Sequence, residues 1–135
     1  EVPINSPEFG YVSSIEGLWY YLITGEKYPE LLKMSGWEAK KYGRNHTREF
    51  TTSQEVFQER IKSAITLKVM SSKRIYDLMS DVDLLPFTHY YVNNGEVHTP
   101  RGNDWIVEHL ETLRSEIRDG LCKPNVSFGV VEFLD

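Results

Sequence analysis

The sequence predicts an α+β fold, namely a mostly helical single domain over residues 1–135 with a small β-sheet or hairpin. Three observations support this fold class. A chain of 135 residues suits one domain with a single core. Several segments have capping-box patterns followed by apolar residues at helical spacing. One aromatic, β-prone run is followed by an Asn-Gly dipeptide, which favours a hairpin.

The first helix is expected to follow a looped N-terminal segment. Residues 1–12 contain two prolines and one glycine, which is typical of an extended or looped chain. Ser13 and Glu16 then have the spacing of a capping box, in which the serine caps the helix and the acid bonds back to its backbone. We therefore expect a helix that runs to about Thr24.

Two short helices are expected next. Pro29 lies near the first turn of the segment 26–36, and Gly36 closes that segment. The segment 37–45 is expected to form another helix, with Gly43 as its C-terminal stop.

Residues 52–70 have the clearest helical pattern. Thr52 and Glu55 make a second capping box, so Thr52 is expected to cap this helix. Apolar residues at helical spacing mark its buried face. They are Phe57, Ile61, Ala64, Ile65 and Val69.

The C-terminal half is expected to contain two more helices and the strands. Ser72 starts one helix, whose apolar residues are Ile75, Leu78 and Met79. The aromatic run 84–92 and the turn at Asn94 and Gly95 predict a hairpin. Residues 126–134 are expected to form a last strand.

Asn103 is expected to cap the final helix, which ends at Gly120. The apolar positions of this helix repeat at helical intervals. They are Ile106, Leu110, Leu113 and Ile117.

The bulk composition excludes some classes of function. A formal charge of −5 and a pI of about 5.4 argue against a general binder of duplex DNA. Cys122 is the one cysteine, so no intrachain disulfide is possible and a reducing, cytoplasmic location is expected. No apolar run approaches the ~20 residues that cross a membrane, so no membrane partner is expected. Because the chain begins at Glu1 and not at Met, it leaves room for a missing N-terminal segment.

The sequence leaves two interpretations of Glu16 open, one structural and one catalytic. A capping box is a common structural device, and the acid then serves only the helix. Alternatively, a carboxylate among Trp19, Tyr20 and Tyr21 has a raised proton affinity and can act in acid–base chemistry. The two roles can coexist at one helix start.

The segment "EAKKYGRN" carries a basic cluster, with Lys40, Lys41 and Arg44 close together and His46 and Arg48 nearby. Such a cluster is usually a solvated helix face. It can also bind phosphate, since the planar guanidinium of arginine fits phosphate oxygens.

The histidines do not have the spacing of metal ligands, so neither a metal site nor a cofactor is expected. His89 lies in the aromatic run and is either a buried, hydrogen-bonded residue or a proton carrier. Cys122 has no evident base beside it, which argues against a thiol nucleophile.

The order of these motifs resembles that of the NADAR family over about residues 8–118. Ser14, Glu16 and Trp19 match the start of the family's first helix, and "EAKKYGR" at 38–44 matches its basic segment. Further similar positions are Lys68 in the long helix, Gly102 and Asn103 at a helix start, and Leu113 with Arg114. The resemblance implies a small α+β domain that cleaves N-glycosidic bonds, on ADP-ribose-type compounds or on ribosylamines of the riboflavin pathway.

The resemblance also implies residue roles. Glu16 would be catalytic, stabilising the positive charge that develops on the sugar. The expected partner is an ADP-ribose-type nucleotide or an ADP-ribosylated nucleic acid. The residues expected to bind it are Ser14, Trp19, Tyr20, Lys40, Arg44, Lys68, His89 and Asn103.

The chain departs from the family's pattern at several positions. Gly17 stands where the family has histidine, Ser53 or Phe57 where it has tryptophan, and His89 where it has an acid. These departures favour an alternative from another class. That alternative is a catalytically degenerate nucleotide-binding or protein-interaction module, such as a phage counter-defence protein. A divergent phage or bacterial member fits the pattern.

Overall fold

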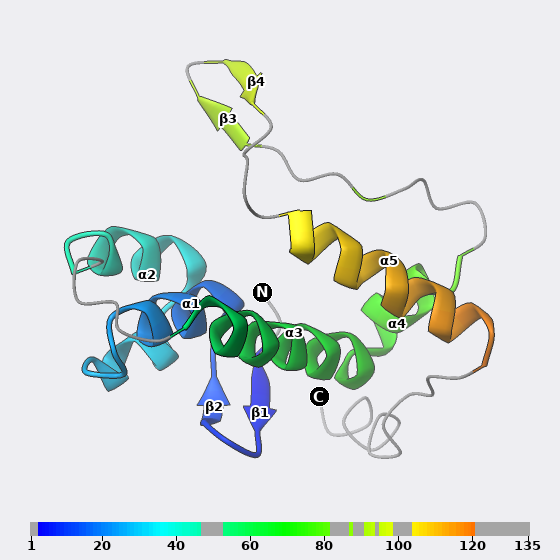
Figure 1. Cartoon of the computed structure of the whole chain (residues 1–135), viewed down its shortest axis with the longest axis horizontal. Helices are drawn as coiled ribbons and strands as arrows, with labels where there is room; N and C mark the ends of the chain where they lie inside the picture. The colour runs from blue at the N-terminus through cyan, green and yellow to red at the C-terminus, as the bar shows by residue number, and fades with distance from the viewer. Residues whose placement is uncertain are drawn as a thin grey trace. The chain divides into compact units, whose positions relative to one another are not determined.

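Helices dominate the chain in the computed structural model, which describes residues 3–46, 53–81, 87, 91–93, 95–98 and 104–120. Two small antiparallel hairpins accompany the helices (Figure 1), so the predicted mostly helical α+β class is confirmed. The chain forms two units, unit 1 at Glu1–Ser72 and unit 2 at Lys73–Asp135. Among the described helices, none is long and apolar enough to span a membrane.

The N-terminal segment of unit 1 is a hairpin, a structure that its prolines did not suggest. Strands β1 (Ile4–Ser6) and β2 (Gly10–Val12) pair antiparallel, with Ser6 opposite Gly10. The Ser6 hydroxyl accepts hydrogen bonds from the backbone N–H groups of Glu8 at 3.2 Å and Phe9 at 3.1 Å. This side-chain turn satisfies the backbone donors of the connection and lets the strands reverse.

Helix α1 (Ile15–Ile23) begins one residue later than predicted. Its N-cap is Ser14, whose hydroxyl accepts from the Gly17 N–H at 3.0 Å and donates to the Met34 carbonyl at 2.9 Å. The predicted cap at Ser13 is wrong, since the Ser13 N–H instead donates to the Leu32 carbonyl at 2.8 Å. The end at Thr24 is as expected.

The next segments are a 3₁₀ helix, η1 (Pro29–Lys33), and helix α2 (Gly36–Gly43). Gly36 opens α2 and does not close the preceding helix as predicted. Ser35 and Glu38 form a complete capping box at this start. The predicted stop at Gly43 is displaced by one residue, because Arg44 is the C-cap.

Helix α3 (Gln54–Ser71) is capped by Ser53, whose hydroxyl accepts from the Val56 N–H at 3.2 Å. The predicted cap at Thr52 is therefore wrong by one residue, and Thr52 itself lies outside the described residues. Four of the five predicted core positions on this helix are buried, and Ile65 is half-buried. The four are Phe57, Ile61, Ala64 and Val69.

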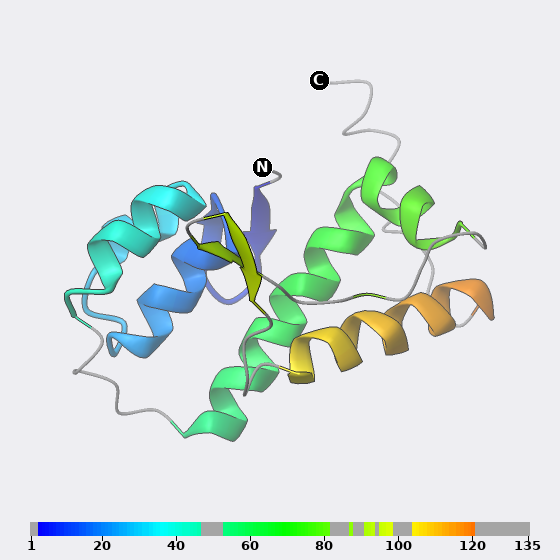
Figure 2. The same ribbon diagram turned by 90° about the horizontal axis from the view of Figure 1, so that it is seen from above.

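Helix α1 is the centre of unit 1. It packs against η1, α2 and α3, and α3 also contacts β1 (Figures 1 and 2). Two glycines set these distances, because a Cβ at Gly17 would lie 2.4 Å from the Leu31 carbonyl oxygen and one at Gly43 would lie 2.4 Å from Cδ1 of Tyr20. The side chains that are less than 2% exposed include Val12, Leu18, Leu22, Leu31 and Ile61.

Unit 2 contains α4 (Lys73–Met79), β3 (Tyr91–Asn93), β4 (Glu96–His98) and α5 (Asp104–Arg118). The hairpin at Asn94 and Gly95 is confirmed, since Asn93 pairs with Glu96 and Gly95 has a φ of 79°. Leu113 and Ile117 of α5 are buried as predicted, whereas Ile106 and Leu110 are half-buried. The predicted cap at Asn103 and strand at 126–134 lie outside the described residues.

Two contacts in unit 2 hold chain segments onto α5. The backbone N–H of Phe87 donates to Glu111 at 2.7 Å, and Arg118 donates to the Asp81 carbonyl at 2.7 Å. The buried Arg114 guanidinium lies 5.8 Å from the centre of the Phe87 ring. Leu113 and Arg114, the pair that resembles the family's motif, are thus both buried in unit 2.

The contact between Tyr20 and Gly43 leads to a stability prediction. Gly43→Ala should lower the free energy of unfolding by about 1–3 kcal/mol, because the new methyl group overlaps the base of the Tyr20 side chain. Chemical denaturation of both proteins measures this difference. In a Tyr20→Gly background, which also removes the Tyr20 Cβ that would lie 2.6 Å from the new methyl group, the same change should become neutral or stabilising, since alanine favours a helix over glycine by about 1 kcal/mol. Equal destabilisation in both backgrounds would contradict the packing explanation.

Candidate functional site

The carboxylate of Glu16 is exposed at the second position of α1. Gly17 occupies the third position, from which a capping-box acid reaches back, so Glu16 cannot fill that structural role. Among the described residues, Glu16 takes part in no hydrogen bond or ion pair. The structural reading of Glu16 as the capping partner of Ser13 is thus wrong, and its carboxylate points to no internal partner in the described chain.

Trp19 and Tyr20 lie one helical turn after Glu16 and therefore share its face of α1. The Trp19 ring meets Phe57 of α3 edge-on, with centroids 4.7 Å apart. The Tyr20 side chain lies against Gly43 of α2. Both aromatic residues are half-buried, so much of each surface is used in helix packing.

Ser14 has a structural position that follows from its burial. It is 2% exposed, and its hydroxyl joins the α1 start to the Met34 carbonyl. These two bonds fix the direction in which α1 begins and so the place of Glu16. A contact with substrate, as the family resemblance implies for Ser14, stays a prediction.

The predicted phosphate-binding cations lie on two different helices. Lys40 and Arg44 are exposed and each directly follows a buried residue of α2, Ala39 or Gly43, so they lie about 100° around the helix from it. Lys68 is half-buried on α3, eleven residues beyond Phe57, which is about 16 Å along the helix axis. Glu16, Trp19 and Tyr20 therefore share one face of α1, whereas Lys40 and Arg44 lie on α2 and Lys68 lies on α3. His89 and Asn103 lie outside the described residues.

Trp37 is a candidate residue that the sequence interpretation passed over. Its side chain is 72% exposed, and the Lys41 ammonium lies 5.2 Å from the centre of its ring. At an exposed site such a cation–π contact stabilises by roughly 0.5–1 kcal/mol. The spacing of four residues between an aromatic and a basic residue was a signal available in the sequence.

A second cluster joins three rings at the end of α2. Tyr28 and Tyr42 lie 4.4 and 5.3 Å from the His46 ring, measured between centroids. The Tyr42 hydroxyl donates to Glu30 at 2.7 Å. This hydrogen bond lowers the pKa of Glu30 and raises the pKa of Tyr42. The hydrogen bond is therefore strongest at pH values between the pKa of Glu30 and the pKa of Tyr42, where the carboxylate is charged and the phenol is neutral.

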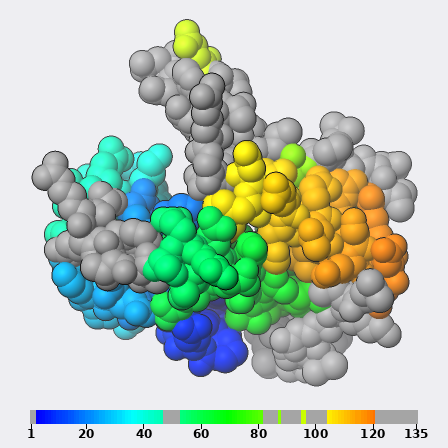
Figure 3. All heavy atoms as spheres, in the orientation of Figure 1, coloured from blue at the N-terminus to red at the C-terminus, as the bar shows by residue number. Residues whose placement is uncertain are grey.

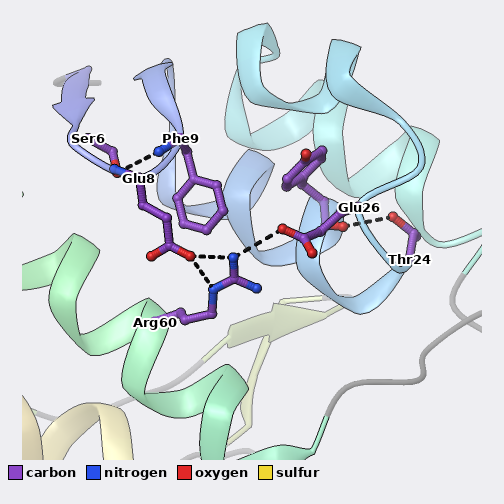
Figure 4. Close-up of polar contacts among 7 residues, drawn as sticks. Ser6, Glu8, Phe9, Thr24, Glu26 and Arg60 are labelled. Atoms are coloured by element: carbon purple, nitrogen blue, oxygen red, sulfur yellow. Dashed lines mark hydrogen bonds and ion pairs between the residues drawn. The ribbon is translucent and has the colours of Figure 1, made fainter.

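A third cluster surrounds Arg60 of α3 and has no counterpart in the sequence interpretation (Figure 4). Its guanidinium donates to Glu8 from Nε at 2.8 Å and also from Nη2, and it donates to Glu26 at 3.1 Å. It also lies 4.6 Å from the centre of the Phe9 ring, which meets Tyr21 edge-on. Burial lowers the pKa of Arg60, but the hydrogen bonds to the two carboxylates outweigh it and raise the pKa overall.

A small cavity adjoins this cluster. Its volume is about 210 Å³, and it lies between the turn at Ser6–Phe9 and the α3 residues Arg60, Ser63 and Leu67. The wall is mostly apolar, and the two charged residues that line it, Arg60 and Glu8, are paired with each other. Its chemistry suits a small apolar group better than a nucleotide.

The described residues contain no group of three or more histidine, cysteine, aspartate or glutamate side chains that could hold a metal ion. Comparisons with family models, with curated proteins and with solved structures found no match to this chain.

The Arg60 cluster leads to a second stability prediction. Arg60→Met keeps much of the side-chain volume but leaves Glu8 and Glu26 without their shared cation, so the free energy of unfolding should fall by about 1–2 kcal/mol. Lys62→Met on the same helix is the matched control. Within the part of the chain that the structure describes, Lys62 pairs only with Glu59, three residues earlier, so its replacement should change stability by less than about 0.5 kcal/mol. Urea denaturation at low and high salt compares the two variants. Equal losses of stability would contradict the stabilising role of the Arg60 ion pairs.

Proposed function

We propose that this protein is an N-glycosidase that cleaves a ribosyl C–N bond, removing ADP-ribose from a modified base or acting on a related ribosylamine nucleotide. One observation supports this most directly. Glu16 projects an exposed carboxylate, without a partner in the described chain, on the helix face that also carries Trp19 and Tyr20. Its place in the sequence is the one that the NADAR resemblance assigns to the catalytic acid.

The chemistry follows from charge. As the C–N bond breaks, positive charge builds on the anomeric carbon and the ring oxygen of the ribose. A carboxylate nearby stabilises this charge and orients a water molecule towards the carbon. The water oxygen forms the new bond to carbon, its proton passes to the departing base, and no cofactor is consumed.

The aromatic and basic residues would supply binding. The exposed parts of Trp19 and Tyr20 offer apolar surface to a base or sugar. Lys40 and Arg44 offer cations to the diphosphate, and the guanidinium of Arg44 has the geometry for two parallel hydrogen bonds to it. Lys68 is the further cation in this proposal.

A second candidate is a module that binds the nucleotide without hydrolysing it. The observation that favours it concerns Gly17, where any Cβ would lie 2.4 Å from the Leu31 carbonyl oxygen. The histidine that the family has at this position therefore has no space here. Binding through the basic face of α2 does not depend on that histidine.

Glu16→Gln tests the catalytic proposal. It keeps the size of the side chain and removes its charge, so kcat should fall by about 100-fold or more while the affinity for the nucleotide changes little. Release of ADP-ribose from an ADP-ribosylated guanine nucleotide, followed by chromatography, measures the rate. Glu55→Gln is the matched control, because Glu55 is an exposed acid at the second position of α3 behind a serine cap.

The possible results separate the candidates. Loss of turnover in Glu16→Gln alone supports the N-glycosidase. Turnover that is equal in Glu16→Gln and the parent protein contradicts the role of Glu16. Tight binding of the ADP-ribosylated guanine nucleotide by the parent protein without release of ADP-ribose supports the binding module instead.

A further inference from the structure

The outer face of α2 gathers aromatic and basic groups, which we call the α2 stripe: Trp37, Lys40, Lys41 and Arg44. These residues are three, four and seven positions from Trp37, so they follow one face of the helix. All four are exposed, and Figure 3 shows the cyan atoms of α2 at the surface of unit 1. The stripe runs about 10 Å along the helix axis.

Packing within unit 1 does not explain the stripe. The buried side of α2 is formed by other residues, including Ala39 and Gly43. Glu38, the acid within the helix, already takes part in the capping box with Ser35. Among the described residues, Lys40 and Lys41 have no carboxylate partner. An indole that is 72% exposed beside Lys40 and Lys41 is a surface that an external group can contact.

The charge of the stripe identifies the external group as an anion with flat apolar parts. The chain as a whole carries a formal charge of −5, so three cations on two helical turns are a local reversal of sign. A surface of about 10 Å along the helix is long enough to meet two neighbouring phosphates of a strand. The indole offers a face on which a base can stack.

We propose that the α2 stripe binds single-stranded nucleic acid, with a base stacked on Trp37 and the phosphates held by Lys40, Lys41 and Arg44. A single strand fits better than a duplex because the base faces of a duplex are covered by their neighbours. Stacking has little sequence preference, so binding is broad. This inference rests on the proposed function only in one respect: there, the α2 stripe would hold the strand while its modified base is cleaved. The binding itself does not require catalysis.

The experiment measures binding of the full chain to a fluorescently labelled, unmodified oligothymidylate of about 12 nucleotides by anisotropy. Trp37→Ala should weaken binding roughly tenfold, because a stacked base is lost. Lys40→Gln with Lys41→Gln should weaken it and reduce the slope of log K against log salt by about 1.4, which is about 0.7 for each lost phosphate contact. Tyr11→Ala and Lys62→Gln, an exposed aromatic and a basic residue away from α2, are the controls and should bind as the parent does.

Three results would overturn the inference. They are no binding of the oligonucleotide by the parent protein, equal binding by Trp37→Ala and the parent, and equal losses in the controls. The result for Glu16→Gln keeps this inference apart from the proposed function, since that variant should bind the strand normally whether or not Glu16 is catalytic. Normal stripe binding with no turnover in the parent protein would contradict the glycosidase alone.

Discussion

The arrangement of unit 1 depends on how closely other segments approach α1. At Gly17 the Leu31 carbonyl, and at Gly43 the Tyr20 side chain, occupy the space that any Cβ would need. Because α2 meets α1 through its Gly43 side, the rotation of α2 about its own axis is set, and Trp37 and Lys40 are left on the outside. Likewise, η1 approaches α1 so closely that position 17, next to Glu16, has no space for a side chain. The absence of a side chain at Gly43 therefore determines which face of α2 is exposed, and its absence at Gly17 determines what surrounds Glu16.

A polar network completes this packing. The Ser14 hydroxyl links the α1 start to the Met34 carbonyl, and Arg60 links α3 to the β1–β2 turn and to Glu26 behind α1. Hydrogen bonds to charged groups stabilise more than neutral ones, and they are directional. Arg60 thus fixes the hairpin and the end of α1 relative to the long helix, whereas apolar burial alone would allow small rotations.

The sequence predicted the features that depend on local physics. The apolar spacing of Phe57, Ile61 and Ala64 and the dipeptide Asn94-Gly95 require no knowledge of distant partners, and both predictions are confirmed. The helix caps were placed one residue early, because adjacent hydroxyl residues such as Ser13 and Ser14 both satisfy a capping pattern. Their backbone dihedrals, which depend on tertiary contacts, decide between them. The link between Glu8 and Arg60 joins residues 52 positions apart, and no local pattern signals it.

The candidate site shows the same limit for function. Spacing placed Glu16 correctly near a helix start and placed Lys40 and Arg44 on one helix. It could not show which residues of α2 are buried, since that depends on the contact of Gly43 with Tyr20. The charges of exposed side chains are screened by solvent over short distances, so in the proposed function Lys40, Lys41 and Arg44 would act on the phosphates that reach α2. We therefore propose that the acid and the α2 stripe act on different parts of one ligand. In that proposal, a strand long enough to contact both would gain affinity from the stripe without altering the charge balance at the bond that breaks.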